Sequence, residues 1–189
     1  LEVFATGTRN HLDFSINSED EMFTYDNTDD GRGWWTRFTH MVDGGFYGYP
    51  WDYWPDDATP AKVEEQIRSG KPGQPYTLWR MAEYGGGSPC GAVSYSEDAL
   101  PAEYHDNNFH CEWGKGRVER FVVERAGGTY KVVKRDDMFL TPGGDLRPVG
   151  ICVTHDGTGF IVTDWNFSGW KNESVGGKVG RLIRLTYTG

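Results

Sequence analysis

The stretch Arg9–Asn27 reads RNHLDFSINSEDEMFTYDN. Apolar residues alternate with polar ones from Leu12 to Ile16, a polar turn follows at Ser18–Asp20, and a second apolar run begins at Met22. Alternation with a period of two on both sides of a short turn is typical of a β-hairpin. The stretch therefore predicts two antiparallel strands that lead into an acidic segment.

The same plan returns near the C-terminus, where residues 147–166 read RPVGICVTHDGTGFIVTDWN. In both copies an acid lies seventeen positions after an arginine, Asp26 after Arg9 and Asp164 after Arg147. Two hairpins with the same charged ends, far apart in the sequence, indicate one structural unit that is used more than once.

A looser third copy lies between the first two. Its expected strands are Gly91–Tyr95 and Phe109–Trp113, and the turn between them has grown into SEDALPAEYHDNN. The second strand again ends in an acid followed by tryptophan, as Asp164-Trp165 does. Unevenly spaced copies favour blades with insertions over a strict solenoid.

Composition agrees with an all-β domain. The chain has 189 residues with 26 glycines and 15% aromatic residues, and it shows no long helical periodicity. Many short strands with glycine-rich turns predict a sandwich, a barrel or a propeller. One short helix is expected at Pro60–Ser69, within an irregular insertion at residues 51–75. Further strands are expected at Leu1–Ala5, Arg37–Val42, Arg117–Glu124, Tyr130–Lys134 and Gly180–Tyr187.

Charge and cysteine content limit the partners. The formal net charge of −9 argues against nucleic acid, because phosphate binding needs clustered lysine and arginine. The three cysteines lack the spacing of a metal site. Cys90 and Cys111 fall on consecutive expected strands, where a disulfide and two buried thiols are both consistent with the pattern, and a buried thiol is also expected at Cys152.

Two segments suggest ligands. Asp26–Gly31, DNTDDG, offers a side-chain oxygen at each of five consecutive positions, which suits a hard cation such as calcium and equally suits an acidic turn in water. Trp51, Tyr53 and Trp54 suit either a wall for stacking sugar rings or an anchor for a long loop.

GTRNHLDFSINSEDEMFTYDNTDD, followed by HMVDGGFYGYP, resembles the glucose/sorbosone dehydrogenase group of pyrroloquinoline-quinone (PQQ) β-propellers. In that group a G-x-R-N turn precedes a hairpin, an acidic loop and a strand ending in GG-x-YG-aromatic-P. GSPCGAVSY, FHCEW and LRPVGICVTHDGTGFIVTDWN are more similar to the membrane-bound dehydrogenase domains of planctomycetes and their relatives. The resemblance implies a six-bladed β-propeller, of which residues 1–189 form a single domain or the C-terminal half, about three blades.

The resemblance also implies a site. Arg9 matches the catalytic arginine that contacts the quinone, with Asn10 beside it, and Arg147 matches a second cofactor arginine. Asp164 stands at the same end of its blade. Carbonyl groups around Thr28 and Asp29 match those that hold the catalytic Ca²⁺, with Asp26 and Asp30 as supporting ligands.

The implied activity is oxidation of a sugar or an alcohol in a secreted or periplasmic protein, with a cytochrome c as a candidate electron acceptor. The family's catalytic base is a histidine on an earlier blade, so we expect the base outside this chain, and no histidine of the chain is assigned to that role. We also expect the chain to associate with a missing N-terminal half or with itself, because open sheet edges promote pairing.

Three alternatives remain open at this point. Arg9 and Arg147 each suit a structural clamp to an acid as well as they suit a cofactor site. A propeller that binds carbohydrate or protein without catalysis has the same pattern. So does a lactonase-like propeller hydrolase with a central cation.

Overall fold

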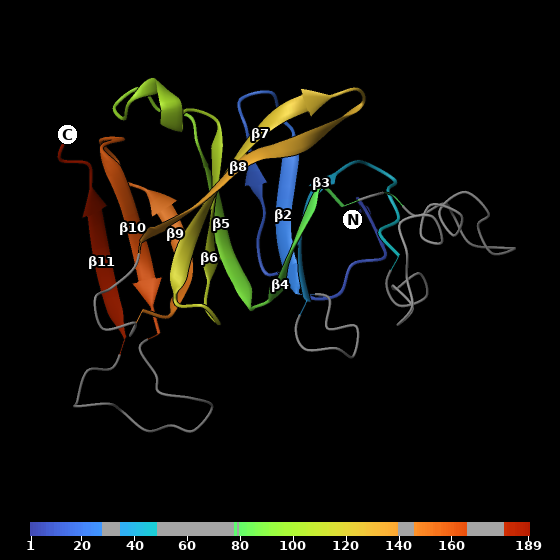
Figure 1. Cartoon of the computed structure of the whole chain (residues 1–189), viewed down its shortest axis with the longest axis horizontal. Helices are drawn as coiled ribbons and strands as arrows, with labels where there is room; N and C mark the ends of the chain where they lie inside the picture. Colours follow the sequence, from blue (N-terminus) through green and yellow to red (C-terminus); the bar gives the residue numbers. More distant parts are fainter. Residues whose placement is uncertain (28–34, 49–77, 79, 140–145, 166–179) are drawn as a thin grey trace, which may run out of the picture.

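The computed structural model describes residues 1–27, 35–48, 78, 80–139, 146–165 and 180–189. These residues form antiparallel β-sheets that stand side by side (Figure 1), and their helical content is one 3-10 turn, η1, at Ala102–Tyr104. Within the same ranges, no helix has the length and apolar character needed to cross a membrane. The expected insertion at residues 51–75, with its helix Pro60–Ser69, lies outside the described residues.

Each sheet is a meander in which strands that follow one another in sequence are neighbours in space. Blade one has the order β1-β2-β3-β4, with bounds Ser15–Ile16, Met22–Asn27, Trp35–Met41 and Ala82–Gly86. Blade two has the order β5-β6-β7-β8, with bounds Pro89–Tyr95, Asn107–Glu112, Arg117–Ala126 and Thr129–Phe139. In the described residues blade three has the order β9-β10-β11, with bounds Pro148–Val153, Gly159–Asp164 and Arg181–Thr186. Consecutive four-stranded meanders are the blades of a β-propeller, which confirms the predicted all-β class and the predicted three blades.

The hairpin predicted in Arg9–Asn27 is present, but its first strand is shorter than the alternation suggested. Ser15 and Ile16 pair with Phe23 and Met22, and Ser15 is buried against blade two. The alternating apolar side chains therefore point the other way. Leu12, Phe14 and Ile16 are 63%, 49% and 44% exposed, on the side of blade one remote from blade two.

The strand expected at Leu1–Ala5 does not form. The segment instead runs beside the turn after β3, where the Phe4 carbonyl accepts a hydrogen bond from the Gly44 N–H at 2.7 Å. Thr6 makes an isolated parallel bridge with Phe46. The other expected strands are confirmed as β3, β7, β8 and β11, with ends that differ by a few residues.

Aromatic side chains form the core between blades one and two. Phe38 on β3 stacks on Phe121 on β7, with ring centroids 4.2 Å apart and planes 7° from parallel. Phe23 and Tyr25 pack on the same cluster. Burial of such rings contributes apolar area together with specific ring geometry.

The core between blades two and three is built around Phe109 and Phe160, whose ring centroids lie 4.6 Å apart. At its centre, β5 and β9 approach so closely that a Cβ atom on Gly91 would lie 2.6 Å from the Gly150 Cα. Cys90 and Cys111 are free, buried thiols in this core, whereas Cys152 is a free thiol on the surface, so the buried position expected for Cys152 is wrong.

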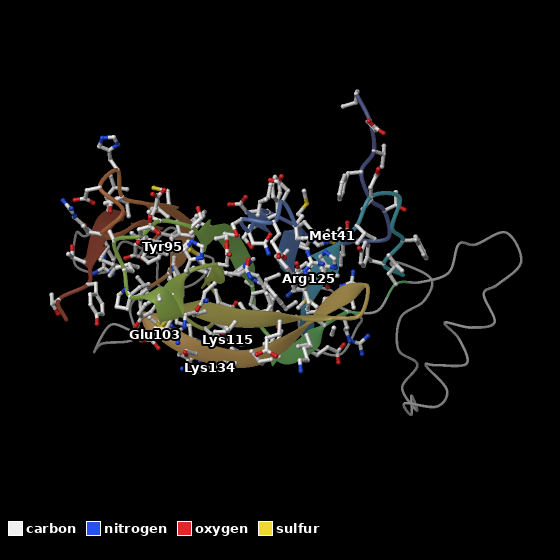
Figure 2. The ribbon with its side chains drawn as sticks, turned by 90° about the horizontal axis from the view of Figure 1, so that it is seen from above. Met41, Tyr95, Glu103, Lys115, Arg125 and Lys134 are labelled. Atoms are coloured by element: carbon white, nitrogen blue, oxygen red, sulfur yellow. The ribbon has the colours of Figure 1, made fainter. Side chains whose placement is uncertain are left out.

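The β7–β8 hairpin reaches across from blade two onto blade one (Figure 1). Figure 2 shows Arg125 near the tip of this hairpin, where its guanidinium lies 2.8 Å from the Glu19 carboxylate of blade one. Tyr130 packs edge-on against Phe23 with ring centroids 5.1 Å apart. The two blades therefore share side chains beyond their facing sheet surfaces.

Candidate functional site

The second strand of every blade ends in a buried acid at the same edge of the molecule, the lower edge in Figure 1. Asp26 is the last but one residue of β2, Glu112 is the last residue of β6 and Asp164 is the last residue of β10. Asp26 and Glu112 are 0% exposed and Asp164 is 3% exposed. A buried carboxylate has to be paired or hydrogen-bonded, so each of the three organises its surroundings.

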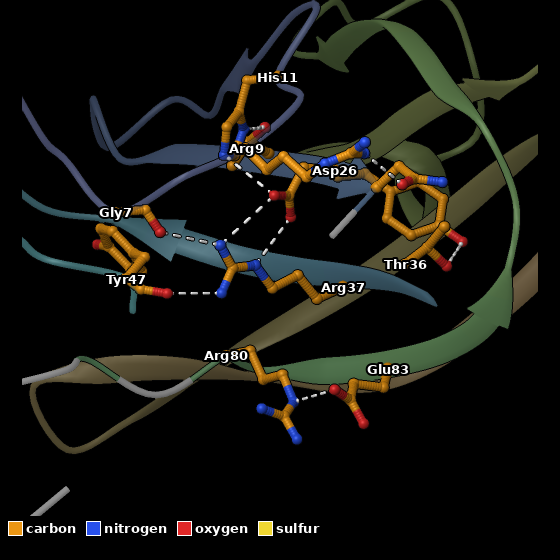
Figure 3. Close-up of polar contacts among 12 residues, drawn as sticks. Gly7, Arg9, His11, Asp26, Thr36, Arg37, Tyr47, Arg80 and Glu83 are labelled. Carbon is orange, nitrogen blue, oxygen red and sulfur yellow. Dashed lines mark hydrogen bonds and ion pairs between the residues drawn. The ribbon is translucent and has the colours of Figure 1, made fainter. Parts of the chain in front are cut away.

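Asp26 is held on two sides, by the Arg37 guanidinium and by the His11 imidazole (Figure 3). Its Oδ1 atom lies 3.0 Å from Nε of Arg37, the residue opposite it on β3, and its Oδ2 atom lies 3.3 Å from Nε2 of His11. Arg37 continues the network by donating to the carbonyl oxygens of Tyr47 at 2.7 Å and Gly7 at 3.3 Å. Both oxygens of Asp26 thus serve to fix the end of β2.

His11 lies against β2, where it contacts Thr24 and Asp26. Its Nδ1 atom lies 2.6 Å from the Thr24 hydroxyl, so both ring nitrogens face protein groups. Burial lowers the pKa of His11, Asp26 opposes that shift, and Arg37 adds to it. His11 therefore helps to hold the Asp26 carboxylate in place.

Arg9 is exposed and donates from Nη1 to the Asn27 side-chain oxygen at 3.0 Å. Asn10, also exposed, pairs with Asn27 in an isolated antiparallel bridge. The Asn27 amide in turn donates to the Gly87 carbonyl at the start of blade two, with a separation of 2.5 Å. Arg9, Asn10 and Asp26, predicted as one site from the sequence, lie together at this end of blade one.

Glu112 occupies the corresponding position in blade two. One carboxylate oxygen accepts the Ser88 N–H, and the other accepts the Lys115 N–H at 2.6 Å. Burial raises the pKa of Glu112, and these two N–H groups together with the Lys115 charge oppose the rise.

Asp164 and Arg147 lie together in blade three. The Arg147 N–H donates to Oδ1 of Asp164 at 2.7 Å, and the Arg181 guanidinium donates from Nε to Oδ2 at 2.6 Å. The Arg147 guanidinium lies over the ring of Trp113 in blade two, 5.9 Å from its centroid. A cation over an indole face is a favourable contact.

Equal spacing in sequence does not put Arg9 and Arg147 at equivalent positions. Asn10 is opposite Asn27, whereas the carbonyl of Arg147 accepts the N–H of Trp165 at 2.8 Å. Both hairpins change register by one residue toward this end, between Ser15–Phe23 and Asn10–Asn27 in the first and between Thr163 and Asp164 in the last. The turn of the last hairpin is one residue longer, because the paired residues Cys152 and Ile161 are nine positions apart, whereas Ser15 and Phe23 are eight apart. Arg147 therefore takes the place of Asn10.

The predicted residues fall into two groups separated by blade two, one around Asp26 and the other around Asp164. Thr28, Asp29 and Asp30 lie outside the described residues. Across the ranges that are described, no group of three or more histidine, cysteine or acidic side chains is arranged to hold a metal ion.

Sequence reasoning noted the acid at position 112 in the repeat but did not assign it to the site, and it missed the partners His11, Asn27, Arg37, Gly87 and Arg181. The repeat contained a signal for Glu112, because Glu112-Trp113 matches Asp164-Trp165. Arg37 and Arg181 could have been found as arginines at or near the start of the strand after each acid.

No protein-family model matches the chain, and no curated protein is significantly similar to it. Solved structures do match. An oxidoreductase of Thermus thermophilus described as a glucose dehydrogenase has a TM-score of 0.69 and 18% identity, over 97% of this chain and 47% of that chain. The PQQ-bound aldose sugar dehydrogenase of Streptomyces coelicolor has a TM-score of 0.60 and 16% identity, over 95% of this chain and 44% of that chain.

The soluble aldose sugar dehydrogenase of Escherichia coli in its apo form gives a TM-score of 0.63 and 16% identity, over 97% of this chain and 46% of that chain. At these identities the likeness establishes the fold. The chain spans less than half the length of each of these structures. The resemblance to sugar dehydrogenase propellers is thus confirmed at the level of the fold.

Proposed function

We propose that this chain forms part of a quinoprotein dehydrogenase that oxidises a sugar or an alcohol with PQQ and Ca²⁺. The observation that carries the proposal is the placement of Arg9 and Arg147 at one edge of the blades, each next to a buried acid. The fold supports it, because the matching structures are sugar dehydrogenases and one of them is PQQ-bound.

The side chains at this edge fit an anionic, planar cofactor. PQQ carries three carboxylates on a fused ring with an ortho-quinone. Guanidinium groups match carboxylates in shape and charge, and Arg9, Arg147 and the Asn10 amide supply such donors at the same edge. The acids beneath them are already bonded to the protein, so they hold the edge in place without repelling the ligand.

When bound, PQQ and Ca²⁺ supply the electrophilic carbonyl that accepts hydride from the substrate carbon. Arg9 would stabilise the negative charge that develops on the quinone, because its guanidinium is held in advance by Asn27. Arg147 would bind a carboxylate. A base must remove the hydroxyl proton, and His11 is unsuited to this because its Nδ1 atom bonds the Thr24 hydroxyl and its Nε2 atom is buried 3.3 Å from Asp26.

Calcium would bind at the loop after Asn27, through carbonyl groups of Thr28 and Asp29 and the carboxylate of Asp30. Asp26 anchors the start of this loop through Arg37. A role for Asp26 as a supporting ligand would require one of its oxygens to leave Arg37 or His11.

Titration with PQQ in the presence and absence of Ca²⁺, followed by the quinone absorbance, tests the proposal. We expect calcium-dependent binding that is lost in Arg9→Ala and kept in Arg125→Ala, a control that removes an arginine from the β7–β8 hairpin. Reduction of an artificial dye with aldoses or alcohols would establish the dehydrogenase. Failure to bind PQQ in a preparation containing all blades would contradict the proposal.

Two outcomes of the same assays favour other functions. Retention on immobilised carbohydrate without quinone binding indicates a binding propeller. Hydrolysis of a lactone without an electron acceptor indicates a hydrolase.

The remaining blades are part of the proposal. The exposed face formed by Leu12, Phe14 and Ile16 and the outer edge of β11 are surfaces that further blades would cover. We expect the 189-residue chain alone to elute from gel filtration as an associated species, and a stable monomer would contradict this. We place the protein outside the cytoplasm, with a cytochrome c as electron acceptor, which cytochrome reduction in place of the dye would test.

A further inference from the structure

One peptide unit joins blade one to blade two at the edge that carries Arg9. The N–H of this unit, from Ser88, donates to the buried Glu112 carboxylate. Its carbonyl, from Gly87, accepts the Asn27 amide N–H at 2.5 Å, and the Asn27 oxygen accepts from Arg9 Nη1 at 3.0 Å. A continuous hydrogen-bonded path therefore runs from a buried carboxylate of blade two to an exposed guanidinium of blade one.

Every intermediate group on this path is fixed. Asn27 is 6% exposed and Glu112 is 0% exposed. Gly87 has no room for a side chain, because a Cβ atom there would lie 2.8 Å from Oε1 of Glu112 and 3.1 Å from Cγ2 of Thr36. The Gly87 carbonyl requires the NH₂ group of Asn27 to face it, which directs the Asn27 oxygen at Arg9.

Blade three repeats the arrangement with different residues. Its buried acid, Asp164, accepts the N–H of the peptide unit between Leu146 and Arg147 at 2.7 Å. The carbonyl of that same unit accepts Nη1 of Arg147 at 2.6 Å. In both places a buried acid fixes a peptide unit, and that unit fixes a guanidinium at the proposed cofactor edge. The recurrence identifies the path as a feature of the site.

We infer that Asn27 is the positioning residue for Arg9, and that it transmits to the guanidinium the orientation of the peptide unit bound to Glu112. The inference rests on the proposed function in one respect, the role of Arg9 in binding the cofactor. A guanidinium that is held in advance loses less side-chain freedom when it binds an anion, so affinity rises without a new contact. Linked hydrogen bonds that end on a charge also strengthen one another.

A double-mutant cycle with Asn27→Leu and Arg9→Ala tests the inference through the Kd for PQQ with Ca²⁺. We expect Asn27→Leu to weaken binding about tenfold, the scale of one hydrogen bond to a charged group. In the Arg9→Ala background the same substitution should change Kd little, because the residue through which it acts is gone. Full additivity of the two losses would overturn the inference.

Asn17→Leu is the matched control. Asn17 is 7% exposed, lies at the other end of the same hairpin and accepts the N–H groups of Glu19 and Glu21. It should lower stability comparably while leaving Kd unchanged. Asn27→Asp, which keeps an acceptor for Arg9 and loses the donor to Gly87, serves if Asn27→Leu does not fold, and it should give a smaller loss of affinity.

A second readout needs no cofactor. In the apo protein labelled with ¹⁵N-arginine, the signal lost in Arg9→Lys identifies the Arg9 guanidinium. Asn27→Leu should let the Arg9 side chain rotate more freely, so that its signal becomes narrower and moves toward the averaged chemical shift of a mobile arginine. Asn17→Leu should leave the signal unchanged. If the wild-type protein does not bind PQQ, the proposed function fails and this spectrum still decides the role of Asn27. An Arg9 signal unaltered by Asn27→Leu would contradict the inference.

Discussion

The Nε2 atom of His110 in blade two lies 3.1 Å from the hydroxyl oxygen of Ser15 in blade one. The same hydroxyl donates to the side-chain oxygen of Asn108 at 2.7 Å. His110 and Asn108 are 0% exposed and Ser15 is 1% exposed, so this polar contact lies entirely within the junction between the blades. Since the Ser15 hydroxyl donates its proton to Asn108, His110 donates its Nε2 proton to Ser15.

Stability should fall in acid because of His110. Burial lowers the pKa of His110 from 6.5 to about 3. Between these pH values His110 is protonated in the unfolded chain and neutral in the folded chain. The free energy of unfolding therefore falls by about 1.4 kcal/mol for each unit of pH below 6.5. Above that pH the residue has no such effect. Urea unfolding measured from about pH 7 to about pH 4 should show a flatter slope for His110→Gln than for the wild type, and equal slopes would contradict the assignment.

Loss of Arg37 should destabilise blade one strongly. Arg37→Met removes the guanidinium that pairs with the buried Asp26 carboxylate and leaves the His11 imidazole beside it. Breaking a buried ion pair in this way costs about 3–5 kcal/mol. Urea denaturation provides the measurement. Arg125→Ala, which removes an exposed partner of Glu19, should have a much smaller effect. Similar losses for the two variants would show that Asp26 does not depend on Arg37.

Gly91 should tolerate no side chain. A Cβ atom at this position would lie 2.6 Å from the Gly150 Cα and 2.7 Å from the Val149 carbonyl oxygen, so Gly91→Ala has to move β5 away from β9. Overpacking of this kind costs about 1–3 kcal/mol. Gly128→Ala is the control, because nothing lies within 4 Å of its Cβ position. Thermal unfolding should separate the two variants, and equal melting temperatures would contradict the close approach.

The three thiols should differ in reactivity. Burial raises the pKa of Cys90 to about 11 and raises that of Cys111 further, whereas Cys152 is exposed. The thiolate is the reactive form, so a thiol reagent at about pH 8 should label Cys152 in the native protein and all the cysteines after denaturation. A mass spectrum of the intact labelled protein gives the count. Native labelling of Cys152→Ser would contradict the burial of the other two.

Much of the fold was accessible from the sequence because the repeat unit is local. Period-two alternation marks strands directly, three copies of the hairpin indicated a repeated unit, and the family resemblance implied about three blades. The alternation failed at Leu1–Ala5 and at the first strand of blade one, since pairing there depends on neighbours rather than on the segment itself. Alternation also could not tell which side of β1 faces blade two, and the polar side with Ser15 is the buried one.

The candidate site was accessible in part. The acids that end each hairpin emerged from the repeat, and Arg9, Asn10 and Arg147 emerged from the family resemblance. The partners that fix them did not, because Asn27 and Gly87 are 60 residues apart and meet only where two blades pack. Counting residues also misaligned Arg147 with Arg9, since the turn of the last hairpin is one residue longer than that of the first.

The aromatic cluster between blades one and two sets the unit of cooperative folding. Phe38 of blade one is covered by Phe121 of blade two, and Phe23 by Tyr130. Neither blade has a complete interior until the other is in place, so the smallest autonomous unit in this part of the chain is a pair of blades. Native-state hydrogen exchange should then show the amides of β2 and β3 opening together with those of β7, as one foldon that crosses the boundary between sheets.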